Sequence, residues 1–127
     1  MRWQRTIAAG ALLEVSFESA RPAPVQGLVL EVGEGHLSWD EQGEEAVAIR
    51  LWADRQESAV LRHIGASDQV VLTAWHAWMH ADLGGDIVRR GERMRTEETP
   101  GGTVLRCGDD DLVVRIAVRQ RARASSA

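Results

Sequence analysis

The sequence predicts a mainly β domain, an antiparallel β-sandwich or a small open barrel. Two observations support this fold class, and a third marks an exception to it. Apolar residues recur at every second position in most segments, which is the period of a strand with one buried face. These segments are short, and turns rich in glycine, proline and aspartate join them. One segment, near residues 68–83, fits a helix instead, so an α+β fold is the alternative.

In the first half of the chain, four alternating segments predict a meander of strands. The first covers residues 13–17 and ends at the two prolines within 20–24, because proline cannot donate to a strand ladder. The next two, 28–32 and 37–39, are separated by the turn GEG and are typical of a hairpin. The fourth, 47–51, again places apolar residues two positions apart.

The second half predicts three consecutive strands. Residues 92–98 meet 103–108 across the turn PGG, and 104–107 meet 112–118 across GDDD. In the last segment the apolar residues at even positions share one face. Residues 55–65 fit either a short strand or one helical turn.

The segment near residues 68–83 contains the stretch LTAWHAWMHADLGG and can be interpreted in two ways. As a helix, it gathers Gln69, Thr73, His76 and His80 into one polar stripe, and Gly84 follows its end. As a strand, its run Val-Val-Leu-Thr-Ala-Trp has favourable β propensity. We expect the helix, because it explains both the polar stripe and the glycine pair.

Composition indicates one soluble domain over residues 1–119 with a flexible polar tail at 120–127. The chain has 127 residues, of which 44% are hydrophobic and 27% charged, which suits a single core. A net charge of -4 argues against nucleic acid as a partner. The N-terminal apolar run is short for a secretion signal, and no run approaches the roughly 20 residues of a membrane span. Because Cys107 is the single cysteine, no internal disulfide forms, and we expect a cytoplasmic protein without membrane association.

Two histidines raise the question of a metal or catalytic site. On a helix, His76 and His80 would have β-carbons about 6 Å apart and could share an ion, whereas on a strand about 13 Å would separate them. A metal site would need a further ligand such as His63. The alternative function is therefore a small metal-dependent or pocket enzyme of β-barrel type, with His76, His80 and Asp82 as catalytic residues and a divalent metal as cofactor.

The leading hypothesis is a non-enzymatic binding or accessory module that recognises a protein partner or a second copy of itself, without a cofactor. The sequence contains none of the common nucleophile, nucleotide-binding or paired-cysteine motifs. Trp52 falls opposite the apolar face of its segment, so we expect it to be exposed and to contact the partner. Arg89, Arg93 and Arg95 are expected to form a charged edge strand beside it.

Overall fold

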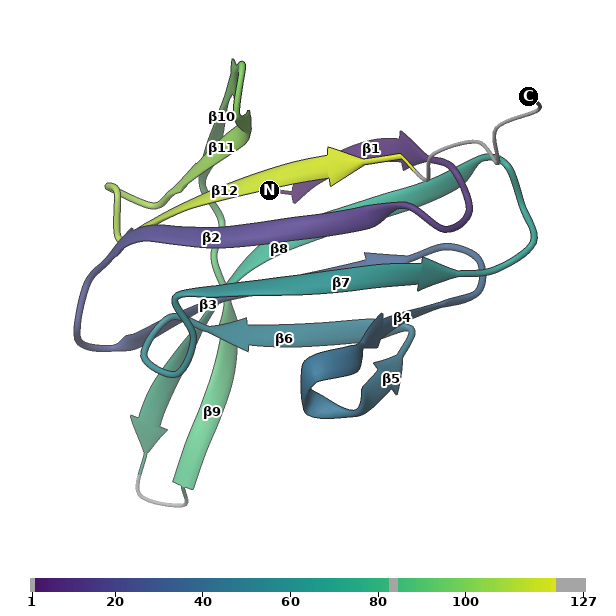
Figure 1. Cartoon of the computed structure of the whole chain (residues 1–127). Helices are drawn as coiled ribbons and strands as arrows, with labels where there is room; N and C mark the ends of the chain where they lie inside the picture. The colour runs from purple at the N-terminus through teal and green to yellow at the C-terminus, as the bar shows by residue number, and fades with distance from the viewer. Residues whose placement is uncertain (1, 83–84, 121–127) are drawn as a thin grey trace.

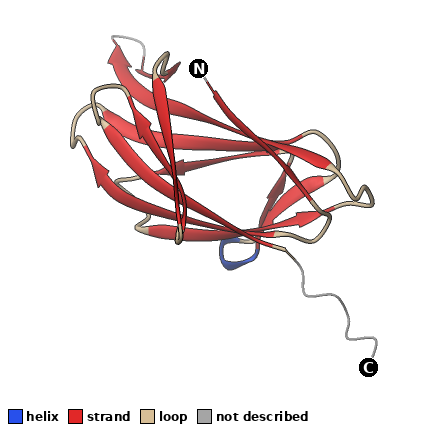
Figure 2. Cartoon of the chain, turned by 90° about the horizontal axis from the view of Figure 1, so that it is seen from above, coloured by secondary structure: helices blue, strands red, loops and turns tan. Residues whose placement is uncertain are grey.

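The computed structural model describes the backbone of residues 2–82 and 85–120, and their side chains outside 80–87. Two antiparallel sheets face each other with the main hydrophobic core between them (Figures 1 and 2). The predicted antiparallel sandwich is confirmed. The polar tail predicted at 120–127 lies outside the described residues except for Gln120.

Sheet A has the strand order β1-β8-β3-β6. Strand β9 also pairs with β8, at residues 77–82, next to residues 70–75 that pair with β1. Strand β8 is its central element, because it pairs with β3 along one edge and with β1 and then β9 along the other. The bounds of these strands are β1 Arg2–Ile7, β3 Val25–Val32, β6 Ala48–Trp52, β8 Val70–Asp82 and β9 Gly85–Arg90.

Sheet B has the order β10-β11-β12-β2-β7-β4-β5. One short 3-10 turn, η1, follows β4 and is the helical element of the described residues. The bounds are β2 Leu12–Ala20, β4 His36–Trp39, η1 Asp40–Gln42, β5 Glu44–Ala46, β7 Ser58–Ile64, β10 Met94–Thr99, β11 Gly102–Cys107 and β12 Leu112–Arg119.

The expected meander in the first half of the chain is wrong, whereas the pairing expected in the second half is confirmed. Strands β2 and β3 belong to different sheets, as do β3 and β4, so the chain passes back and forth between the layers. Val47 lies at one such passage, between β5 and β6, and is exposed rather than buried. By contrast, β10, β11 and β12 pair consecutively across the two turns that their glycines and aspartates predict.

The helix expected near residues 68–83 is also wrong, because residues 70–82 form the long strand β8. An extended backbone at this position supplies ladder partners to three strands, which a helix could not do. Leu72 and Ala74 face the main core, while Ala77 packs on the outer face of sheet A. Apolar side chains on both faces of β8 imitate the wide apolar arc of a helix.

The outer face of sheet A carries a second, smaller hydrophobic cluster. Trp52 on β6 packs there with Val29 and Ala77 and is only 8% exposed, which contradicts the exposure expected from its sequence position. Its indole lies over Gly27, its register partner on β3; a β-carbon at Gly27 would come within 2.5 Å of Trp52 Cε3. The glycine therefore makes room for the ring, and neighbouring side chains cover the rest of it.

Candidate functional site

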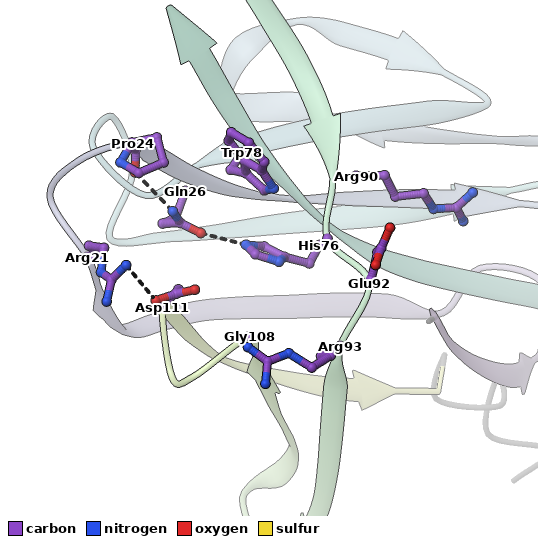
Figure 3. A pocket seen from close by; sticks show the side chains of 11 residues that line it. Arg21, Pro24, Gln26, His76, Trp78, Arg90, Glu92, Arg93, Gly108 and Asp111 are labelled. Atoms are coloured by element: carbon purple, nitrogen blue, oxygen red, sulfur yellow. Dashed lines mark hydrogen bonds and ion pairs between the residues drawn. The ribbon is translucent and has the colours of Figure 1, made fainter.

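A pocket of about 420 Å³ opens at one end of the sandwich, where segments from both sheets converge (Figure 3). We call it the mouth pocket. Its floor is formed by Gln26 on β3 and His76 on β8. Its rim comes from the loop between β2 and β3, the segment 91–93 that crosses from β9 to β10, and the turn between β11 and β12. Its volume is in the range typical of small-ligand sites.

A chain of hydrogen bonds fixes the floor. The side-chain amide of Gln26 donates from Nε2 to the Pro24 carbonyl at 3.0 Å, so its Oε1 is turned toward His76. His76 Nε2 lies 2.5 Å from that oxygen and must be the donor, because an amide oxygen can only accept. In the neutral imidazole, this hydrogen bond places the proton on Nε2 and leaves a lone pair on Nδ1.

Burial keeps His76 neutral. The ring is 3% exposed, and desolvation lowers its pKa, while the negative charge of Asp111 opposes this shift. Nδ1 accepts no hydrogen bond from a described residue and lies against Gly91, where any β-carbon would collide with it. Because this nitrogen is covered by backbone, the imidazole is better suited to hold the floor in place than to act as a base on a ligand.

The rim carries two arginines, each anchored by its backbone and paired with a carboxylate. The Arg21 amide donates to the Asp111 carbonyl at 2.7 Å, and Arg21 Nη1 lies 3.3 Å from Asp111 Oδ1. The Arg93 carbonyl accepts from the Gly108 amide at 3.0 Å, and Arg93 Nη1 lies 3.0 Å from Asp109 Oδ1. Backbone anchoring at both positions sets the two guanidinium groups on the rim of the same pocket.

A third arginine, Arg90, points in a different direction. Its side chain extends away from the centre of the pocket (Figure 3), and its guanidinium lies 4.7 Å from the centroid of the Trp75 ring. Trp75 is half-buried at the edge of the outer cluster of sheet A. This cation-π contact joins the positive charge of the rim to the outer face of the sheet.

The arginines proposed as a partner-binding edge fall on two different edge strands. Arg89 lies near the end of β9, at an edge of sheet A, whereas Arg95 lies in β10, at an edge of sheet B. Arg93 lies in the crossing between them. Both Arg89 and Arg95 are exposed, and Arg95 Nη2 donates to Asp110 Oδ1 at 2.9 Å. Trp52, the aromatic residue expected beside them, is instead part of the outer cluster.

The metal site that depended on a helix has no geometric basis in the extended strand. Residues four apart on β8 are separated by about 13 Å along the strand, rather than the about 6 Å expected on a helix. The side chains of His80 and Asp82 lie outside the described part of the chain. His63 on β7 is buried, with Nε2 2.8 Å from the Glu34 carbonyl, and does not line the mouth pocket. Among the described residues, no three potential ligands cluster in a way that could hold a metal.

Sequence reasoning missed Gln26, Arg21 and Asp111 as site residues. Gln26 carried a signal: it occupies the inward position that precedes Leu28 and Leu30 in the alternation, where a polar side chain needs a buried partner. Arg21 and Asp111 gave none, because an arginine after a strand and an aspartate in a turn are ordinary. Their meeting depends on β2 and β12 being neighbours in sheet B.

Comparison of the chain with protein-family models, curated proteins and solved structures finds no match in any of the three. In the described residues, no helix is long and apolar enough to cross a bilayer.

Proposed function

We propose that this domain is a non-enzymatic binding module that recognises an acidic segment of a protein partner. The contact surface is the arginine ridge, which we define as Arg89, Arg90, Arg93 and Arg95. The observation that carries the proposal is the crossing from β9 to β10, which connects edge strands of opposite sheets within a few residues. The ridge therefore spans the side of the sandwich with four exposed guanidinium groups.

The ion pairs that Arg93 and Arg95 make within the domain are weak enough to be exchanged for contacts with a partner. The side chains of Arg93 and Asp109 are 68% and 76% exposed, and those of Arg95 and Asp110 are 68% and 47% exposed. Ion pairs with this much solvent exposure contribute about 0–1 kcal/mol. Carboxylates of a docking segment can replace Asp109 and Asp110 at little cost, with bidentate geometry at each arginine.

Arg90 and Trp75 add an anchor of a different kind. A guanidinium held over an indole has already lost part of its side-chain freedom, so less entropy is lost when a partner binds. Tryptophan and arginine are also the residues most enriched among energetic centres of interfaces. Trp75 thus takes the aromatic role that the sequence suggested for Trp52, whose ring instead stabilises the outer face of sheet A.

Charge reversal on the ridge tests the proposal. Arg89→Glu combined with Arg95→Glu is compared with wild type in quantitative pull-downs from cell extract and in sedimentation velocity at several concentrations. Arg50→Glu combined with Arg55→Glu is the matched control, because it changes the same charge at exposed positions elsewhere. We expect a species that associates with wild type and with the control pair, dissociates at raised salt, and is lost from the ridge variant.

Cross-linking then has to place the ridge against an acidic stretch of that species, or of a second copy of this chain. If wild type, ridge variant and control behave alike in both assays, the proposal is wrong.

A further inference from the structure

We propose that the mouth pocket binds a carboxylate group carried on an apolar body, with Arg21 and Arg93 as its charged ligands. The carboxylate can belong to a free organic acid or to an acidic residue of a partner segment. In the second case the inference rests on the proposed function, since that segment would lie along the arginine ridge and place one side chain in the pocket.

The two arginines approach the pocket from different segments. Arg21 enters from the loop after β2, and Arg93 from the crossing between β9 and β10; Figure 3 shows them on the same side of the pocket as Asp111. Their backbones are fixed by hydrogen bonds to residues of the β11–β12 turn. A planar guanidinium donates two parallel hydrogen bonds, which match the two oxygens of a carboxylate.

The ion pairs with Asp109 and Asp111 show that these arginines bind carboxylates. Each aspartate places a carboxylate oxygen 3.0–3.3 Å from a rim guanidinium. Asp111 is held in place by its backbone bonds to Arg21 and Cys107, whereas the Asp109 side chain is 76% exposed. Asp109 does not line the mouth pocket, but it pairs with Arg93 from outside, so a ligand carboxylate in the pocket competes with it for that guanidinium.

The floor and walls of the pocket define the rest of the ligand. The floor is uncharged, because the neutral His76 donates to Gln26 and the Gln26 amide donates to Pro24. Trp78, which is half-buried, and Pro24 supply apolar surface on the side of the pocket opposite Arg93 (Figure 3). Glu92 and Asp111 also line the pocket, so the binding of an acid depends on the rim arginines together with this apolar surface. The arrangement favours an acid with an apolar portion over a small hydrated anion.

A titration with defined probes tests the assignment. The probes are benzoate, acetate and inorganic phosphate, with benzamide as a neutral analogue, and an end-blocked peptide rich in glutamate and aspartate. The readout is the NMR chemical shift of the arginine Nε–H and tryptophan Nε1–H groups. We expect saturable shifts of Arg21, Arg93 and Trp78 with benzoate or with the acidic peptide, and none with benzamide.

Two single variants should move the affinity in opposite directions. Arg93→Gln removes a charged ligand and should weaken binding about tenfold, the value of one charge-assisted hydrogen bond. Asp109→Asn removes the competitor and should tighten binding about threefold, the value of an exposed ion pair. Arg50→Gln and Asp68→Asn make the same changes of charge outside the pocket and should leave the affinity unaltered.

The outcome of the titration identifies the kind of ligand or rejects the site. Saturation by benzoate identifies free organic acids as ligands, and saturation by the peptide alone identifies a partner residue. No saturable shift with any probe, or equal affinity of wild type and Arg93→Gln, overturns the carboxylate site. That result leaves the ridge proposal standing if the ridge variant still loses its partner, because Arg89 and Arg95 do not line the mouth pocket.

Discussion

His76 Nε2 lies 2.5 Å from Gln26 Oε1, so a side-chain hydrogen bond joins β8 to β3 at the point where the main core ends and the mouth pocket begins. Gln26→Leu would leave the buried Nε2–H of His76 without an acceptor. We expect the free energy of unfolding to fall by about 1–3 kcal/mol, the cost of an unsatisfied buried donor. Urea unfolding measures the loss, and Gln42→Leu at an exposed position is the control. Equal stability of the two variants would count against this account of the floor.

Stability should depend on pH through His76. Burial lowers its pKa below the ordinary value of 6.5, so the unfolded chain binds the proton at higher pH than the folded chain. The contribution of His76 to the free energy of unfolding is therefore complete above pH 6.5. It declines as the pH falls from 6.5 toward the folded pKa. Imidazole NMR signals followed during a pH titration report that folded pKa directly.

Two variants should shift the pKa of His76 in opposite directions. Asp111→Asn removes the charge that favours protonation and should lower the pKa of His76 further. Gln26→Glu places a carboxylate at the acceptor of Nε2–H and should raise the pKa. A wild-type pKa at or above 6.5, or shifts of the wrong sign in these variants, would refute the neutral imidazole.

Cys107 should be unreactive in the folded protein. Its thiol is buried in the main core, and desolvation, assisted by the charge of Asp111, raises its pKa to about 12. Since the thiolate is the reactive species, labelling by iodoacetamide at pH 8 should be far slower in buffer than in 8 M urea. Mass spectrometry over time measures both rates, and rapid labelling of the native protein would show that the thiol is accessible.

Gly27 and Gly33 form a matched pair for testing the outer cluster. A β-carbon at Gly27 would lie 2.5 Å from Trp52 Cε3 and 2.7 Å from the Leu51 carbonyl, whereas at Gly33 the nearest atom would be 3.8 Å away. Gly27→Ala should therefore lower the free energy of unfolding by about 1–3 kcal/mol through overpacking, and Gly33→Ala should not. Thermal unfolding and tryptophan fluorescence measure the difference. A tolerated Gly27→Ala would mean that Trp52 does not lie over the glycine.

Alternation in the sequence was enough to predict strands but not to assign them to sheets. Leu13, Val15 and Leu112 are fully buried, as their spacing predicts, because a period of two identifies which face of a strand is apolar. It carries no information about the neighbouring strand. For that reason the hairpins with short turns at the end of the chain were predictable, and the passages between sheets in the first half were not.

The segment 70–82 shows where periodicity fails. An inner strand with apolar residues on both faces loses the contrast between inward and outward positions, and its pattern then resembles that of a helix. Two residues of the pocket, His76 and Arg93, were candidates from the sequence. Arg93 was identified from a local cluster of arginines, whereas the pocket needs Arg21 and Asp111, which are distant in sequence, to be brought together by the pairing of β2 with β12.

The position of β12 constrains how the protein is made. Leu112–Arg119 is the last described strand, yet it lies inside sheet B, between β11 and β2. While the ribosome is still synthesising this strand, β2 has an unpaired edge and the main core lacks Val114 and Ile116. The sandwich therefore closes only after nearly all of it has left the exit tunnel, and until then the open edge of β2 is a site for aggregation or for chaperone binding.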